Sequence, residues 1–222
     1  MKNKVSLIIP TKNEPYIGIL VNELRKTFGN SMEIIVIEKG RILPKVKANV
    51  MRQKTSGLGN AFFEALQHAH GNIIANMDGD GSHSVDDLKK LLAAIKNKDL
   101  VIGSRFAKGG ENNDVSQRRI VTAVARRADA LLLGLDIKDM TSGFFVVRRE
   151  VLEKIKNKNV LGYKMLFPIA FAAKKNDFRI KEVPIVFTPR KAGNSKVAFN
   201  SSGFKEVYYE IKMALLLRLG LF

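Results

Sequence analysis

The sequence contains no cysteine, and this absence excludes several kinds of site. Without cysteine the chain can form neither a disulfide framework nor a thiolate zinc site. It also has no run of eighteen consecutive apolar residues, so no segment is predicted to span a membrane. The apolar run within residues 1–14 is too short for a signal peptide, and a cytoplasmic location is therefore expected.

Acidic residues are scarce relative to basic ones. Lys and Arg number 38 against 21 Asp and Glu, and the formal net charge is +17. Such a charge attracts nucleic acid, anionic membrane lipids or phosphorylated substrates, and it does not choose among them. Aromatic residues make up only 8% of the chain and no recognised nucleic-acid-binding motif is present, so nucleic acid is not an expected partner.

Buried-type strands and amphipathic helices alternate along the first hundred residues. With 222 residues and 45% hydrophobic content, the chain is long enough for one compact domain with a substantial core. The patterns predict strands at 5–9, 33–37, 72–77 and 100–102, and helices at 16–28, 56–70 and 88–95. This order predicts an α/β fold with a mostly parallel central sheet flanked by helices, whose ligands bind beyond the carboxyl ends of the strands.

The second half of the chain departs from this regular alternation. The sequence predicts an Arg-rich helix at 117–133, a loop at 139–143, a strand at 144–147 and a helix at 149–155. A late strand at 180–187 contains Pro184, which favours an edge or bulge position because proline cannot donate to a ladder.

The C-terminal segment has the pattern of an amphipathic helix. Its apolar residues fall three or four apart, which places them on one stripe: Phe204, Tyr208, Ile211, Leu215, Leu219 and Phe222. Lys205, Lys212 and Arg218 add positive charge, which suits a helix lying in a membrane interface. Packing of the stripe against the body of the domain is the alternative, and the pattern alone leaves both open.

Two aspartates separated by one glycine follow the third predicted strand. In the segment 76–83, NMDGDGSH, alternate residues of an extended chain share a side, so Asp78 and Asp80 can face one hard cation. A calcium-binding loop is excluded because its twelfth position requires Glu and here holds Lys89. The competing interpretation is a plain Asp-Gly turn that ends a strand.

Six further segments in the right order decide between these interpretations. Together with the acidic turn, they resemble the family-two glycosyltransferases of the polyprenyl-phosphate sugar synthase type, most closely the dolichyl-phosphate mannose synthases. The resemblance rests on residues 5–14, 71–87, 101–106 with Gly109 and Gly110, Arg118 with Arg119, 139–144, 182–185, and Arg190 with 193–196. It covers nearly the whole chain and implies the GT-A fold, with a catalytic domain at 1–200 and the amphipathic helix at 201–222.

The resemblance also implies an activity and a set of site residues. It implies an inverting enzyme that moves a hexose, foremost mannose from GDP-mannose, onto a polyprenyl or dolichyl phosphate. Mg²⁺ or Mn²⁺ would be held by Asp78, Asp80 and Ser82, the last through its hydroxyl or a water. The residues implied in catalysis are Asp80, Arg105 and Asp139; those on the donor are Pro10, Thr11, Glu14, Glu38, Asp78, Arg190 and Lys196; those on the acceptor phosphate are Arg105, Arg118 and Arg119.

Two positions depart from the family pattern. Glu38 and Lys39 stand where the family has a pair of aspartates, the first of which helps to hold the nucleotide base, and Ser82 stands where Gln is frequent. A synthase that uses UDP-glucose or a UDP-N-acetylhexosamine therefore remains an alternative, as does a nucleotide-sugar-binding protein without turnover. Some relatives continue into membrane spans, whereas no such span is predicted in this sequence. We therefore expect the protein to attach peripherally to the cytoplasmic membrane face, with a membrane-anchoring partner.

Overall fold

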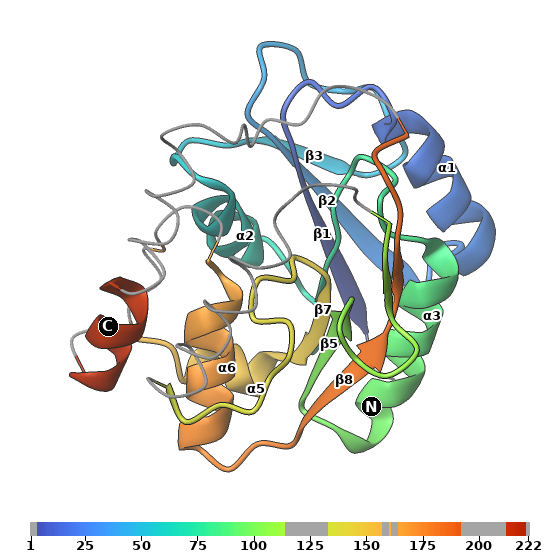
Figure 1. Ribbon diagram of the computed structural model, residues 1–222. Helices are drawn as coiled ribbons and strands as arrows, with labels where there is room; N and C mark the ends of the chain where they lie inside the picture. Colours follow the sequence, from blue (N-terminus) through green and yellow to red (C-terminus); the bar gives the residue numbers. More distant parts are fainter. Residues whose placement is uncertain (1–3, 114–132, 157–159, 161–163, 192–211, 221–222) are drawn as a thin grey trace.

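The structure is a computed structural model that describes residues 4–113, 133–156, 160, 164–191 and 212–220 (Figure 1). Its centre is a seven-stranded sheet in the order β3-β2-β1-β4-β7-β5-β8. The strands are β1 (Val5–Thr11), β2 (Met32–Glu38), β3 (Asn49–Arg52), β4 (Ile73–Asn76), β5 (Leu100–Ser104), β7 (Phe145–Arg148) and β8 (Ile180–Pro184). All neighbours pair in parallel except β7, which is antiparallel to both β4 and β5.

Helices cover both faces of this sheet. They are α1 (Ile17–Phe28), α2 (Leu58–Leu66), α3 (Val85–Ala94), a 3-10 turn (Ile95–Asn97), α5 (Arg149–Glu153) and α6 (Leu166–Lys175). Figure 1 shows α1 and α3 on one side and α2, α5 and α6 on the other. A short parallel pair, β6 (Glu111–Asn112) with β9 (Val186–Phe187), lies outside the main sheet.

The strands are apolar on both sides because each face packs under helices. In β1, Leu7 and Ile9 belong to the core beneath α1 and α3, whereas Ile8 between them belongs to the core beneath α2, α5 and α6. Successive strand residues point to opposite faces, so a doubly covered strand reads as a continuous apolar run rather than an alternating one. This confirms the predicted α/β class and the mostly parallel sheet.

The sequence patterns place most elements of the first half correctly. The helix expected at 56–70 is shorter, at Leu58–Leu66, and the strand expected at 180–187 is two strands divided at Ile185. Pro184 ends β8, which is an edge strand as predicted. The Arg-rich helix expected at 117–133 lies outside the described residues apart from Leu133.

Neither β3 nor α6 was predicted, and each lacks a clear period. β3 is a four-residue edge strand, and its residues are half-buried or exposed, so it shows no apolar alternation. In α6, residues Leu166 to Ala173 are almost all buried, which removes the polar face by which a helix is recognised. Pro168 near its start further weakens the helical pattern, although proline is tolerated in the first turn.

The described part of the C-terminal helix, residues 212–218, packs on the body of the protein. Met213, Ala214 and Leu217 are buried in the core that also holds α2, α5 and α6. Leu215 and Leu219, two members of the predicted apolar stripe, are instead 44% and 68% exposed. This part of the chain therefore packs on the body of the protein through residues adjacent to the predicted stripe, and not through the stripe itself. Across the described ranges, no helix is long and apolar enough to cross a membrane.

Candidate functional site

The acidic turn lies directly on the carboxyl end of β1. Asp78 follows β4, which pairs with β1 in parallel, so the turn emerges beside Thr11. A β-carbon built at Gly79 would lie 2.8 Å from Thr11 Cγ2 and 3.3 Å from Ile9 Cγ2. Glycine between the two aspartates therefore lets the turn approach the end of β1 closely. This close approach explains why the spacing residue has no side chain.

Asp80 is oriented by its own turn and by a distant arginine. Its Oδ1 accepts hydrogen bonds from the Ser82 amide (3.0 Å) and the Ser82 hydroxyl (2.6 Å). Its Oδ2 lies 3.2 Å from Arg190 Nε. The carboxylate is almost fully buried, at 7% side-chain exposure. In this arrangement Ser82 fixes one oxygen of Asp80, and the other faces a cation.

Asp78 is backed by a buried histidine that the predicted site set did not contain. His83 Nδ1 lies 3.4 Å from the Asp78 amide, which donates to it, and 3.8 Å from Asp78 Oδ2. The imidazole stacks on Phe144 at 4.5 Å and meets Phe187 edge-on at 5.3 Å. Burial lowers the pKa of His83, so the ring is neutral and can accept from the amide.

The carboxyl group of Asp78 has an altered pKa. Burial raises its pKa, and the neighbouring carboxylate of Asp80 raises it further, whereas His83, Arg190 and Arg105 act in the opposite direction. The side chain nevertheless keeps 31% exposure, which leaves it accessible to a ligand. Two carboxylates that disfavour each other's charge are a suitable place for a divalent cation.

The segment after β9 lies over the acidic turn. The Thr188 amide donates to Ser82 O (3.2 Å), and the Lys191 amide donates to Asp80 O (3.0 Å). The Lys191 ammonium lies 3.2 Å from the Tyr16 hydroxyl and 5.2 Å from the Tyr16 ring centre. These contacts bring Arg190 to Asp80 and place Lys191 beside the acidic turn.

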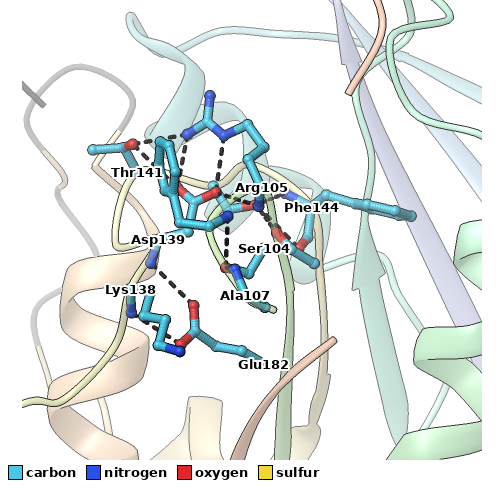
Figure 2. Close-up of polar contacts among 11 residues, drawn as sticks. Ser104, Arg105, Ala107, Lys138, Asp139, Thr141, Phe144 and Glu182 are labelled. Atoms are coloured by element: carbon cyan, nitrogen blue, oxygen red, sulfur yellow. Dashed lines mark hydrogen bonds and ion pairs between the residues drawn. The ribbon is translucent and has the colours of Figure 1, made fainter. Parts of the chain in front are cut away.

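The second half of the site is an arginine held by an aspartate (Figure 2). Arg105 follows β5, and its Nε and Nη2 donate to the two carboxylate oxygens of Asp139 at 2.8 and 2.7 Å. Nη2 also donates to the Thr141 hydroxyl (3.0 Å), and the Arg105 amide donates to Asp139 Oδ2 (3.0 Å). Asp139 has no exposed side-chain surface, whereas Arg105 keeps 20%. The aspartate thus orients the guanidinium group rather than facing a ligand itself.

Glu182 of β8 fixes the loop that carries Asp139. Its carboxylate accepts from the amides of Lys138 (2.9 Å) and Asp139 (3.0 Å), as Figure 2 shows. The sequence comparison included Glu182 in a family segment without assigning it a role. A glutamate that precedes a Val-Pro pair gives no local signal of this contact, because its partners lie 43 and 44 residues away.

The two halves of the site are adjacent. A β-carbon at Gly143, in the loop that follows Asp139, would lie 3.4 Å from Asp78 Oδ1. The Phe187 ring centre lies 5.4 Å from the Arg105 guanidinium carbon and 5.3 Å from the His83 ring centre. The structure therefore brings the acidic turn, Arg190 and the Arg105–Asp139 pair to one edge of the sheet.

Glu38, at the end of β2, is bound within the protein. One carboxylate oxygen accepts from Thr11 Oγ1 (2.8 Å), and the other accepts from the amides of Asn13 (2.8 Å) and Gly40. The side chain is buried, at 1% exposure. Lys39 turns away and donates to Thr55 O at 2.6 Å. Glu38 therefore shapes the loop after β1, and a contact to the nucleotide base stays a prediction.

The remaining predicted residues are placed as follows. Pro10 and Thr11 end β1, and Glu14 is half-buried one turn before α1. Lys196, Arg118 and Arg119 lie outside the described residues. Four residues outside the predicted site support it. Glu182 accepts from the Asp139 amide and the Lys191 amide donates to Asp80 O, both across long sequence separations. Tyr16 contacts Lys191, and His83 accepts from the Asp78 amide five residues away.

The chemistry of the acidic turn fits a hard divalent cation. Among the described residues, no group of three or more His, Cys, Asp or Glu could hold a metal by itself. Mg²⁺ is commonly bound through one or two carboxylates together with the phosphates of its substrate, and a pair of aspartates is sufficient for that mode. Asp78 and Asp80 would supply the protein oxygens.

Solved structures share this fold. The chain resembles glucosyl-3-phosphoglycerate synthase from Mycobacterium tuberculosis in complex with Mn²⁺, UDP-glucose and phosphoglyceric acid. The TM-score is 0.72 at 18% sequence identity, and the match covers 99% of this chain and 80% of that one. A second form of that protein, with Mg²⁺ and UDP, gives a TM-score of 0.67 at 15% identity over 99% and 80% of the two chains. At such identity the likeness establishes the fold, which is the predicted GT-A fold.

The family follows from comparison of the sequence with models of protein families. The family model described as glycosyl transferase family 2 matches residues 6–156, and the chain belongs to this family.

Three relatives with assigned functions are similar to this chain in sequence. The polyprenol monophosphomannose synthase of Mycolicibacterium smegmatis is 36% identical over 168 residues, which cover 72% of this chain and 62% of that protein. The dolichol-phosphate mannosyltransferase of Pyrococcus furiosus is 35% identical over 214 residues, which cover 87% and 59%. The chain thus spans about three fifths of the length of these two relatives. The undecaprenyl-phosphate mannosyltransferase of Micrococcus luteus is 29% identical, with 88% of both chains covered.

Proposed function

We propose that this chain is an inverting glycosyltransferase that moves mannose from GDP-mannose onto a polyprenyl or dolichyl phosphate. The observation that carries the proposal is the meeting, at one edge of a GT-A sheet, of a carboxylate pair suited to a metal and a guanidinium suited to a phosphate. The names of the three relatives support the sugar and the class of acceptor.

Asp78 and Asp80 would hold Mg²⁺ or Mn²⁺ against the pyrophosphate of the donor. Held there, the ion would supply positive charge against the charge that develops on the departing nucleotide. The structural neighbours crystallised with Mn²⁺ or Mg²⁺ and a uridine nucleotide support the use of a divalent metal. Ser82 holds Asp80 Oδ1, which leaves Oδ2 to face the ligand side of the turn.

Arg190 changes partner in this scheme. Its guanidinium lies 3.2 Å from Asp80 Oδ2 and is 31% exposed, so it balances the carboxylate before a donor is present. When the donor binds, Arg190 moves to the pyrophosphate, which it can contact through two parallel hydrogen bonds. Lys196 of the same segment is proposed as a further phosphate ligand.

Arg105 positions the acceptor phosphate. Asp139 and Thr141 fix the plane of its guanidinium, and the rings of Phe106 and Phe187 lie 5.4 Å from its central carbon. A phosphate monoester has a second pKa near 6 and is mostly a dianion at neutral pH. It can attack the anomeric carbon directly with inversion, so Asp139 need not act as a base. Arg118 and Arg119 are proposed to assist in binding the phosphate.

A second nucleotide sugar is a candidate for the donor. Glu38 is one methylene longer than the family's aspartate and is already bound by three protein donors, so the contact to the base differs from the family pattern. A polyprenyl-phosphate synthase that uses a UDP-hexose or UDP-N-acetylhexosamine is the alternative that this observation favours. Pro10, Thr11 and Glu14 would line the donor side in either case.

Radiolabelled donors discriminate these candidates. The protein is incubated with GDP-mannose, UDP-glucose or UDP-N-acetylglucosamine, polyprenyl phosphate and Mg²⁺ or Mn²⁺, and the organic phase is counted. We expect label from GDP-mannose to enter the organic phase and the signal to disappear with EDTA. Label from a UDP-sugar alone would reassign the donor, whereas binding of a donor without transfer would leave a nucleotide-sugar-binding protein.

The acceptor also sets the proposed location. A polyprenyl phosphate is embedded in a bilayer, so the enzyme works at the cytoplasmic membrane face as a peripheral protein, with a membrane-anchoring partner as a further proposal. Residues 1–200 form the proposed catalytic domain and residues 201–222 an amphipathic helix.

A further inference from the structure

The connection between β2 and β3 presents two adjacent apolar side chains to solvent. Ile42 is 80% exposed and Leu43 is 37% exposed, and Pro44 follows them. A single exposed aliphatic residue needs no explanation. Here two apolar residues follow one another in the connection between Glu38 and Asn49. We call residues 41–45 the β2–β3 tip.

The backbone of this tip is held in place from below. Arg52, the last residue of β3, donates to Gly40 O and, at 2.9 Å, to Arg41 O. Lys39 donates to Thr55 O at 2.6 Å and ties the start of the loop to the segment after β3. The fold thus fixes the chain on which Ile42 is exposed.

The tip lies in a stretch of sequence whose charged residues are all basic. From residue 39 to residue 63 the sequence contains no Asp or Glu. The same stretch contains six cations, all with exposed side chains: Lys39, Arg41, Lys45, Lys47, Arg52 and Lys54. Arg41 and Lys45 directly flank the apolar residues.

The tip lies on the side of the sheet that carries the candidate site. β2 ends at Glu38, which pairs with Thr11 of β1 and with Arg52 of β3 in parallel register. The tip therefore leaves the same carboxyl edge from which Asp78 and Arg105 emerge, and in Figure 1 the β2–β3 connection rises beyond that edge. A surface that binds the tip would therefore face the edge of the sheet that carries the candidate site.

We infer that the β2–β3 tip docks on an anionic lipid bilayer, with Ile42 and Leu43 inserted among the headgroups. This inference rests on the proposed lipid-phosphate acceptor, because it places the active edge of the enzyme against the membrane that contains it. Aliphatic residues ringed by cations bind such an interface through apolar burial and through attraction to anionic lipids. A second copy of the chain fits poorly, since two clusters of six cations would repel each other.

The absence of tryptophan from the chain permits a clean test. Ile42→Trp places a single fluorophore at the tip, and Lys174→Trp places one at the end of α6, which precedes β8 and thus lies at the opposite edge of the sheet. The full chain is mixed with vesicles of phosphatidylcholine, with and without phosphatidylglycerol, and with brominated lipids as quenchers. We expect a blue shift and quenching for Ile42→Trp with anionic vesicles, and neither for Lys174→Trp.

A charge variant tests the electrostatic part. Each cation near an anionic surface contributes a factor of about five to binding, so Arg41→Gln with Lys45→Gln should weaken vesicle binding roughly thirtyfold. Lys174→Gln with Lys175→Gln, which removes the same charge at the opposite edge, should change it about twofold or less.

Three results would overturn the inference: no blue shift of Ile42→Trp on vesicles, equal quenching of both tryptophans, or a blue shift that follows protein concentration without lipid and so reveals a second copy. The readout is independent of catalysis. Insertion of the tip in a protein that transfers no sugar would refute the proposed function alone, whereas transfer to a short-chain acceptor without insertion would refute the tip alone.

Discussion

At the scale of single residues, the site depends on side chains that orient other side chains. Asp139 and Thr141 hold Arg105, Ser82 holds Asp80, and the buried His83 supports Asp78 through its amide. Such supporting contacts keep a reactive constellation in place before the substrate arrives. These contacts also explain why the site contains supporting residues that no sequence motif predicts, beside the residues that the motifs do predict.

Replacement of Arg105 by lysine tests its role on the acceptor. Lysine keeps the charge and loses the two-point contact to Asp139, which is worth about 1.5–3 kcal/mol for bonds between charged groups. We expect the KM for polyprenyl phosphate to rise by about one to two orders of magnitude and the KM for the donor to change little. Arg179→Lys, which alters another Arg–Asp pair at the opposite edge of the sheet, is the matched control. A rise in the donor KM alone would contradict the assignment.

A β-carbon at position 79 should disturb the acidic turn. Gly79→Ala would place a methyl group 2.8 Å from Thr11 Cγ2, and we expect a loss of stability of about 1–3 kcal/mol from overpacking. Gly18→Ala is the control, because a β-carbon there meets nothing within 4 Å and alanine is the better helix former. Thermal unfolding should show a lower Tm for the first variant and an equal or higher Tm for the second. Equal behaviour of the two would mean that the turn does not need the close approach.

At the scale of elements, one aspartate connects three strands. Asp99, before β5, accepts from the Arg179 amide and guanidinium at the start of β8, and lies 3.3 Å from Arg148 Nε at the end of β7. Hydrogen bonding from Arg179 lowers the pKa of the Asp99 carboxyl, and burial opposes this only in part. The interaction stabilises the edge of the sheet on which β8 carries Glu182.

Asp99→Asn should therefore destabilise the fold in a pH-dependent way. Because the pKa is lower in the folded state than the unfolded value of about 3.9, the carboxylate's contribution is complete above that value and is lost as the pH falls through the folded pKa. We expect a loss of roughly 2 kcal/mol at pH 7 in denaturant unfolding, and a smaller difference from the unaltered protein at pH 3. A difference that stays constant down to that pH would show that charge plays no part.

The strength of local patterns decided which elements could be predicted. Strands such as β1 and β2 are buried on both faces, so their sequences are continuous apolar runs that can be recognised directly. The acidic turn could be recognised because it follows such a run. β3 and α6 depend on neighbours for their identity, since one is a half-exposed edge strand and the other is buried nearly all around. The Arg105–Asp139 and Asp80–Arg190 pairs join residues 34 and 110 positions apart, so their meeting follows from topology and not from spacing.

At the scale of the whole molecule, the described part of the C-terminal helix belongs to the core. Leu217 is 4% exposed and packs with α2, α5 and α6, whereas Leu215 on the next face is 44% exposed. Leu217→Ala should cost about 2–3 kcal/mol of unfolding free energy, and Leu215→Ala about 0.5 kcal/mol or less. Chemical denaturation of the two variants checks this. If both were neutral, the helix would not pack as the structure shows, and a purely interfacial role would gain support.

The same helix still presents Leu215 and Leu219 to solvent, and the β2–β3 tip presents Ile42 and Leu43. Apolar surface at two places, on a chain with a net charge of +17, agrees with a protein that works against a charged lipid surface. Under the proposed function, phosphate-bearing substrates and the membrane would account for the large positive charge that the sequence alone could not assign.

The most direct test of the central claim is metal-dependent binding of the donor. Titration calorimetry with GDP-mannose, in the presence of Mn²⁺ or of EDTA, compares the unaltered protein with Asp80→Asn and with Asp86→Asn, whose carboxylate is 80% exposed on α3 and pairs with Lys89. We predict binding that requires Mn²⁺, is lost in Asp80→Asn and is unchanged in Asp86→Asn. Binding of equal strength in Asp80→Asn, or in EDTA, would contradict the assignment of the acidic turn as the metal site of a glycosyltransferase.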